Sequence, residues 1–401
     1  MVKANSLIYA VYVCLVIGIL CAGLLFVSDL YSRLNLHYNS LESLYIAHRS
    51  AVHYALGQFP DTETTIEGTD GIASQSSMRP YGVFDILSVQ SHDAHDSIAS
   101  CYLAAPINRD PTCLFVSRIS RSISYSGAVR LIGEKSIPGG VLTINFLSGE
   151  KTTLQSEGPS REQQSLLPPF SDRFEKAFQN ANFIGVGRGE LSQGENGVYH
   201  RSFAEPGAQL STRSLDGMAL SGNFLVTASD TLVVPRSSTL DNVILRAPVI
   251  LIEEGFRGRL QAFATKSLLV GKDVVLRYPS VLCLKAPGAG LSELALGEKS
   301  RVAGLLVLFG NDVGNIPQHK LHIDPEAVVT GDVYCSGKVS IRGKVNGSVY
   351  ANRMYYEDGG TASENALVGT WIDVSKRPAF FVSPNLFETN NKRYGIAGRL
   401  E

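Results

Sequence analysis

The chain has 401 residues, 44% of them hydrophobic, which is enough for two or three domains with an apolar core. Its net charge of −1 provides no basic field, so the composition argues against nucleic-acid binding. The 38 Gly, 16 Tyr and 17 Phe, against one Trp, are typical of a β-rich chain with many turns.

The first predicted element is a membrane anchor with a short N-terminal tail, residues 1–28. No charged residue lies between Ser6 and Ser28, and at about 1.5 Å per residue such a helix spans a hydrocarbon core of about 30 Å. A cleaved signal peptide is the alternative, but its apolar region is usually about 7–15 residues long, and no small-x-small cleavage site follows here. Neither Cys14 nor Cys21 has the context of a lipoprotein cleavage site.

The charges that flank this run predict its orientation. Lys3 and the N-terminal amine lie on the short side, whereas Asp29, Arg33, Glu42 and Arg49 mix both signs on the other side. The positive-inside rule then places the N-terminus in the cytoplasm. We therefore expect a single-pass protein of the inner (cytoplasmic) membrane with a periplasmic body.

Residues 29–58 predict an amphipathic helix that continues the anchor until Gly57 and Pro60 end it. Its stripe residues recur at alternating spacings of three and four. The stripe can lie along the body of the protein or pair with another helix, and its histidines are expected in the seam rather than on a metal. Its members are Leu34, His37, Leu41, Leu44, His48, Ala51 and Ala55.

Residues 59–121 are expected to form a linker followed by a cap-like β region. Thr, Ser, Gly and Asp dominate Phe59–Met78, which is typical of a loop. Apolar pieces between Tyr81 and Val116 indicate strands.

One cluster in this region has the residue types of a metal site. His92, Asp93, His95 and Asp96 can converge on a divalent ion if the segment is an extended loop. A solvated polar loop has the same composition, and no further ligand can be placed nearby. The sequence therefore predicts no metal site.

Four cysteines lie outside the membrane run. Cys101 and Cys113 are twelve residues apart and can either form a disulfide in an oxidising compartment or remain two buried thiols. Cys283 and Cys335 fall at apolar strand positions, which predicts that they lie in the core.

Residues 122–360 carry a repeat of apolar-x-apolar triplets. The first three triplets are 18 residues apart, the last two are also 18 apart, and a fourth lies between them with insertions on either side. Tyr125–Ile137 has the same style. The triplets begin at Leu232, Ile250, Leu268, Leu294, Leu321 and Val339.

A finer interval of six residues lies inside this repeat. Gly331, Gly337 and Gly343 are six apart, and each precedes a valine by two residues. Alternation within each six predicts a short strand, and Gly between the strands allows corner conformations. Three such strands make one turn of a triangular β-helix, in which each turn buries its apolar side chains only by stacking on the next.

The predicted fold class is therefore mainly β: a single-stranded triangular β-helix, a solenoid of about 18 residues per turn, with an N-terminal transmembrane and amphipathic helix. A β-sandwich is the alternative. The regular spacing and the lack of Asn-Gly or Asp-Gly hairpin signals at the right places disfavour it.

An insertion is expected to interrupt the β-helix at about 151–217. It contains a predicted helix over Ser171–Asn180, with Ser171 as its N-cap. Gly185, Gly187 and Gly189 lack the full spacing of a nucleotide-binding loop, and no Lys-Ser/Thr pair follows them, so a glycine-rich turn is expected.

Residues 361–401 are expected to be a C-terminal capping segment. Val368–Val382 alternates around Trp371 and Phe380-Phe381. A strand there can cover the last turn of a β-helix, which would otherwise present unpaired backbone.

The repeat supplies no recognisable catalytic groups. Acyl-transferring β-helix enzymes need a base, usually His, yet His319 and His322 lie at an insertion and its edge without an evident partner. Polysaccharide cleavage needs clustered carboxylates, and no Gly-x-Ser-x-Gly is present. The sequence therefore predicts no enzyme, no cofactor and no catalytic, cofactor-binding or metal residue. The scattered acids are Glu253, Glu254, Asp273, Glu298, Asp324 and Glu326.

Two resemblances bear on these expectations. Thr330–Ala351 resembles the repeat of bactofilins, bacterial polymer-forming cytoskeletal β-helix proteins, although bactofilins are shorter and carry no insertion as long as this one. The whole chain is similar to uncharacterised membrane-anchored Bacteroidetes proteins, through Ser124–Gly139, Ala247–Ala264 and Tyr278-Pro-Ser280. The resemblance implies a β-helix and self-association, and no activity.

These observations predict a non-catalytic scaffold, a structural or assembly component of the bacterial cell envelope. Its expected partners are the membrane, envelope proteins or further copies of itself, and no nucleic acid. One alternative is a pseudopilin-like component of a pilus or secretion machine, although the early Glu and the preceding Gly that pilins use are missing. The other is a carbohydrate-binding or carbohydrate-active surface protein.

Overall fold

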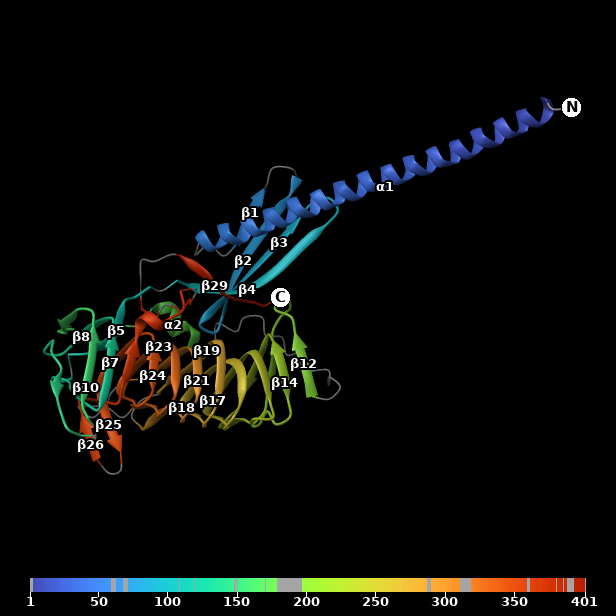
Figure 1. The fold of residues 1–401 in the computed structure, drawn as a ribbon. Coiled ribbons are helices and arrows are strands. Elements are labelled where there is room, and N and C mark those ends of the chain that lie inside the picture. Colours follow the sequence, from blue (N-terminus) through green and yellow to red (C-terminus); the bar gives the residue numbers. More distant parts are fainter. Residues whose placement is uncertain are drawn as a thin grey trace. The chain divides into compact units, whose positions relative to one another are not determined.

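The computed structural model describes residues 3–58, 63–67, 71–107, 109–118, 120–147, 149, 151–169, 171–178, 197–286, 290–310, 319–358, 361–379, 381–384, 386–387 and 393–400. The chain is mainly β, with one long N-terminal helix (Figure 1), as the sequence predicts. Two compact units are distinguished. Unit 1 comprises Met1–Ala55, Asp61–Ser77 and Val89–Ser100, and unit 2 comprises Leu56–Pro60, Met78–Ser88 and Cys101–Glu401.

Helix α1 is continuous over Lys3–Gly57, which confirms the predicted joining of anchor and amphipathic helix. Its N-terminal run has exposed apolar side chains on every face, Leu7 to Leu30 among them. Among the described helices it is the one that is long and apolar enough to cross a membrane.

The second half of α1 packs in unit 1. Leu44, His48 and Ala51 of the predicted stripe are buried, together with Val52. The His48 ring lies 3.1 Å from the Ser91 hydroxyl through Nδ1 and 2.7 Å from the Ser100 hydroxyl through Nε2. The stripe therefore faces strands of this unit, and its histidine is a seam residue, as expected.

An antiparallel sheet contributes to both units and replaces the predicted linker. Residues 63–67 pair with residues 73–77, although both segments are rich in Ser, Thr and Glu. The polar composition concealed these strands, because Ser74 and Ser76 are buried and their hydroxyls make hydrogen bonds instead of being solvated. The strands, in sheet order, are β1 (Glu63–Glu67), β2 (Ala73–Tyr81), β3 (Phe84–His92), β4 (Ser97–Pro106) and β29 (Tyr394–Arg399).

Unit 2 contains parallel strands that fall into three rows. Row 1 comprises, in order of pairing, β12 (Val198–Arg201), β14 (Ala219–Gly222), the first parts of β17 (Thr239–Ile252), β18 (Arg257–Val270), β19 (Val275–Lys285), β21 (Arg301–Phe309) and β23 (Val328–Ile341), then β24 (Lys344–Asn346), β28 (Trp371–Asp373), β7 (Ala128–Ile132) and β10 (Thr153–Glu157).

Row 2 comprises β13 (Ala208–Ser211), β15 (Phe224–Thr227), later parts of β17, β18, β19, β21 and β23, then β25 (Val349–Asp358), β5 (Thr112–Val116), β8 (Glu134–Ile137) and β11 (Ser160–Glu162). Row 3 comprises β16 (Thr231–Val234), the ends of β17 and β18, β20 (Ser292–Leu296), β22 (His319–Ile323) and the ends of β23 and β25. A separate parallel sheet holds β27 (Ala366–Val368), β6 (Ser124–Ser126) and β9 (Thr143–Ile144).

The register confirms the alignment that the triplets predict. Leu232 pairs with Ile250 and Ile250 with Leu268, each one repeat apart, and all three side chains are buried. The register also places Leu321 opposite Val339. Equal turns put equivalent residues in one column, so a single buried column accounts for the interval of 18 residues.

The order of strands within the rows is not the order of the chain. Row 1 rises from β12 to β28 and then continues with β7 and β10, so the N-terminal residues 128–157 lie beyond residue 373. Figure 1 shows β10 and β12 at opposite ends of the stack. The parallel strands therefore begin at β5, ahead of the predicted start near Ser122, and β10–β13 belong to the rows although they fall in the predicted insertion.

The predicted C-terminal cap also differs from the structure. β28 pairs with β24 on one side and with β7 on the other, so Trp371 lies within row 1 and not at its end. The expectation that the last residues cover the last turn failed because the turns from residues 112–162 already occupy that position.

A second apolar layer covers the outer side of row 2. Phe263 and Phe309 point outward there and meet Phe178 of helix α2 (Asp172–Phe178), with ring centroids 5.5 and 4.8 Å apart. The backbone amide of Phe174 donates to the Ser171 hydroxyl, which confirms the predicted N-cap. Residues 179–180 of the predicted helix lie outside the described residues.

Candidate functional site

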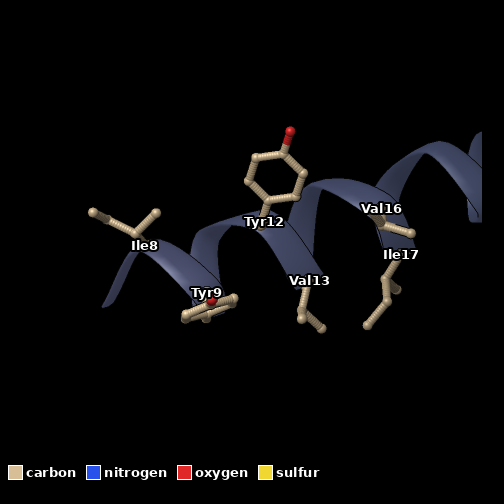
Figure 2. Close-up of a pocket in the computed structure, with 6 residues that line it drawn as sticks. All are labelled: Ile8, Tyr9, Tyr12, Val13, Val16 and Ile17. Carbon is tan, nitrogen blue, oxygen red and sulfur yellow. The ribbon is translucent and has the colours of Figure 1, made fainter. Parts of the chain in front are cut away.

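The hollow in Figure 2 lies on the membrane run of α1. Its walls are exposed apolar side chains on one face of a single helix, so acyl chains would cover it if the helix spans a bilayer. It has no opposing wall and carries no catalytic group. The lining residues are Ile8, Tyr9, Tyr12, Val13, Val16 and Ile17.

The segment with the residue types of a metal site forms a turn. The Asp93 carboxylate accepts hydrogen bonds from the backbone amides of His95 and Asp96, at 2.8 and 2.7 Å, and from the Ser40 hydroxyl. These bonds lower its pKa to about 2. No group of three metal-binding side chains is found among the described residues, and Asp93 stabilises the turn between β3 and β4 instead.

The cysteines outside the membrane run are free thiols. Cys101 and Cys113 are both buried, which is the second of the two predicted alternatives, and burial raises the pKa of the Cys113 thiol to about 11. Cys283 and Cys335 are buried in the core as predicted. A raised pKa keeps a thiol protonated near neutral pH, so these side chains act as apolar core groups.

The two histidines of the repeat occupy different environments. His319 is fully buried at the start of β22, and neither ring nitrogen has a hydrogen-bond partner. His322 lies on the outer face, where the Tyr355 hydroxyl contacts its ring and Glu293 is 3.8 Å away. Burial lowers the pKa of His322 although Glu293 opposes this effect. No cavity among the described residues adjoins either ring, so the geometry gives neither a substrate.

The acidic residues lie at the corners between row 3 and row 1. Each follows the end of a row 3 strand, and Glu298 is paired with Lys272 at 2.8 Å. The hydrogen bond lowers the pKa of Glu298 and raises that of Lys272. This pairing makes a surface ion pair rather than a catalytic pair of carboxylates.

One end of the stack has features that point to an interaction. We define residues 141–162 as the terminal turn; it carries β9, β10 and β11. Val141, Ile144 and Phe146 are 67%, 56% and 78% exposed. Leu154 pairs with the buried Val129, so it continues an interior column, yet it is itself 36% exposed. A buried column of the stack therefore ends in solvent here.

The terminal turn also leaves strand edges open. β10 pairs with β7, β11 with β8 and β9 with β6, and the register places no described strand on their other sides. An open edge with exposed apolar side chains is a surface on which another strand can pair. The turn is nevertheless well fixed, since the buried Lys135 ammonium donates to the carbonyl oxygens of Gly133, Glu157 and Gly158, at 2.7–3.0 Å.

Sequence reasoning placed the terminal turn in the insertion. The signal that could have found it is Thr153-Leu154-Gln-Ser-Glu, which matches Ala128–Ile132 at an interval of 25 residues rather than 18. The segment containing Gly185, Gly187 and Gly189 lies outside the described residues.

Comparisons of the chain with protein-family models, with curated proteins and with solved structures find no match.

Proposed function

We propose that this chain is a membrane-anchored, non-catalytic scaffold of the bacterial cell envelope whose copies associate through the terminal turn. The supporting observation is the exposed apolar edge formed by Ile144, Phe146 and Leu154. The proposal includes a resemblance in architecture to the bactofilins: the three rows of unit 2 form a triangular β-helix.

The β-helix is supported by the way in which single strands contribute to the rows. Val339, Val345 and Ala351 are six residues apart, are fully buried, and belong to rows 3, 1 and 2 in turn. A chain that adds one six-residue strand to each row and then returns to the first row winds as a helix with three sides. Gly304 pairs with Gly331 at the corner between rows 1 and 2, where both have left-handed φ values.

A second copy is the partner that this end fits. Every copy carries a parallel ladder with an end at β12–β13 and an end at β10–β11, so the strand geometry needed to continue one copy exists in the next. Such head-to-tail contacts are heterologous and extend into rods unless they close. Anchoring of copies in one membrane raises their effective concentration, which favours a contact of modest intrinsic affinity.

Self-association can be tested on the full chain in detergent by sedimentation over a range of protein concentrations, with negative-stain imaging. We expect concentration-dependent oligomers for the natural chain and mainly monomers for Ile144→Lys/Phe146→Lys, since a charge on an apolar edge opposes strand pairing. Leu291→Lys is the control, because Leu291 is equally exposed but lies before β20. A natural chain that stays monomeric at every concentration would refute the proposal.

The proposed location is the inner membrane, with the N-terminus in the cytoplasm and the body in the periplasm, from the flanking charges alone. The measurement is labelling of Lys266→Cys, an exposed position of β18, by a membrane-impermeant maleimide after permeabilisation of the outer membrane. Labelling that needs lysis would place the body in the cytoplasm.

A second candidate, a pseudopilin-like subunit, is favoured by one observation. The C-terminal half of α1 packs through Leu44, His48 and Ala51 in the unit that contains antiparallel strands, so a membrane helix continues directly into a folded domain. This candidate predicts crosslinks between membrane helices of α1 and those of pilus or secretion subunits, and no dependence on the terminal turn.

A further inference from the structure

The outer face of row 1 carries a second, independent surface. The register aligns eight outward positions, one from each successive strand, so that they form a line across the sheet. Along this line cationic residues occupy alternate strands and apolar residues the strands between them. In order, the positions are Arg257, Val275, Arg301, Val328, Lys344, Trp371, Arg130 and Gln155.

The first three cations of this line are free to bind an anion. Arg257, Arg301 and Lys344 are exposed. Among the described residues no carboxylate lies within ion-pair distance of any of the three side chains, whereas most other cations of unit 2, such as Arg259 and Lys338, are paired. Their charge is therefore not compensated within this face of the molecule.

The acids nearest to the line are engaged elsewhere. Asp241 binds Arg259 at 2.9 Å and also Arg277 at 3.5 Å. Asp373 is buried and accepts from Arg130, and Glu298 at the neighbouring corner binds Lys272. Because each of these carboxylates has a cation of its own, they do not neutralise the line.

Trp371 fixes the spacing at the far end of the line. The Lys344 ammonium and the Arg130 guanidinium each lie 4.8 Å from the centre of its ring, one on each neighbouring strand. Adjacent strands are about 4.8 Å apart, so cations on alternate strands repeat at about 10 Å. Val275 and Val328 supply shallow apolar steps between the cations.

This repeat matches a linear polymer with one acid group per two units. In an extended β-linked acidic polysaccharide with twofold symmetry, alternate sugars present the same side, so carboxylates on one side recur once per disaccharide. The C–H faces of the intervening sugars can rest on the apolar positions. A single-stranded nucleic acid fits less well, because its bases need exposed aromatic faces, and the ring of Trp371 is already occupied by two cations.

We propose that the outer face of row 1 is a binding site for an extended acidic polysaccharide. Arg257, Arg301, Lys344 and Arg130 contact successive carboxylates on one side of the polymer, and Val275, Val328 and Trp371 lie beneath the sugars between them. The site is independent of the terminal turn and of self-association.

The test is calorimetric titration of the full chain in detergent with three probes of equal length: β-1,4-linked mannuronate oligomers, neutral β-1,4-linked manno-oligosaccharides and single-stranded DNA. We expect binding of the mannuronate oligomer that weakens with added salt. Arg257→Gln/Arg301→Gln/Lys344→Gln should weaken it about tenfold or more, because each exposed ion pair contributes modestly and three are lost together.

The matched control is Lys176→Gln/Arg213→Gln/Lys266→Gln, which removes the same charge from exposed positions outside the line. Thermal unfolding checks that both triple variants are folded, as expected for exposed side chains. An equal loss of affinity in both variants, equal binding of the neutral oligomer, tighter binding of DNA, or no binding of the mannuronate oligomer would each overturn the proposal.

Discussion

At the scale of single residues, polar side chains in this protein are placed to fix backbone rather than to react. Asp93 accepts from two backbone amides in its own turn, and Lys135 donates to three backbone carbonyls, two of them in the terminal turn. Either side chain could have been assigned chemistry from the sequence. Each has its hydrogen-bonding capacity engaged by the chain itself.

Asp93 permits a prediction about pH. Its folded pKa of about 2 lies below the model value of 3.8, so the carboxylate stabilises the fold fully above about pH 4, and this contribution is lost as the pH falls toward 2. We expect the Asp93 carboxyl carbon, assigned by its loss in Asp93→Asn, to titrate near pH 2 in an NMR experiment. Ser40→Ala should raise that midpoint, because the Ser40 hydroxyl donates to the carboxylate. A midpoint at the ordinary value of Asp would contradict the observed bonds.

At the scale of elements, the corners of the rows depend on glycine. Gly331 has a φ of 137°, and a Cβ built there would overlap the carbonyl oxygen of Gly304 in the turn stacked against it. Gly369 has a φ of 60° but no atom within 4 Å of such a Cβ. One position combines backbone strain with a steric conflict, and the other has strain alone.

We therefore expect Gly331→Ala to destabilise the protein by about 3 kcal/mol or more, because the stacked turns must separate. Gly369→Ala should cost about 1–2 kcal/mol, the cost of a left-handed conformation for a residue with a Cβ. Thermal unfolding of the two variants, with hydrogen exchange of β23, measures the difference. Equal losses would show that contact with the Gly304 carbonyl is unimportant.

At the scale of the whole molecule, periodicity predicts composition of the rows but not their order. The interval of 18 residues found Leu232, Ile250 and Leu268, because equal turns place equivalent side chains in one buried column. It could not place β5 against β25, since Phe115 and Tyr350 are 235 residues apart and any turn can stack on any other through the same backbone bonds. Local patterns contain no information about which turns are neighbours.

The candidate surfaces show the same division. The terminal turn was missed because its interval differs from 18 and its residues are mostly polar, apart from a few such as Ile144 and Phe146. The line of cations on row 1 was also missed, because it exists only once β28 and β7 are placed next to β24. Both features follow from the order of turns, which sequence periodicity leaves open.

A buried polar cluster joins the segments that this order brings together. The Arg377 guanidinium binds Asp332 and the Ser348 hydroxyl, both at 2.6 Å, and the Ser348 hydroxyl donates to the carbonyl of Thr112. These residues come from β23, from just before β25, from the start of β5 and from the segment after β28. The cluster therefore connects the N-terminal strand to the C-terminal turns.

Burial raises the pKa of Asp332, and the charge of Arg377 opposes that rise. Arg377→Met should cost about 3–5 kcal/mol near neutral pH, because it leaves a carboxylate buried without a cation. The folded pKa of Asp332 should rise further above its unfolded value, so the stability of this variant should fall as the pH increases from about 4 through that raised pKa. Unfolding by urea at pH 5 and pH 8 measures both effects.

Two comparisons make this prediction specific. Arg342→Met removes a cation whose pair with Asp358, at 3.2 Å, is partly exposed, so it should cost less than about 1 kcal/mol and add no pH dependence. Arg377→Met/Asp332→Leu removes both charges and should regain part of the lost stability, since no buried carboxylate remains. If Arg377→Met is no worse than Arg342→Met at either pH, the order of turns does not depend on this cluster, and backbone pairing between β5 and β25 is then sufficient to hold the N-terminal strand in place.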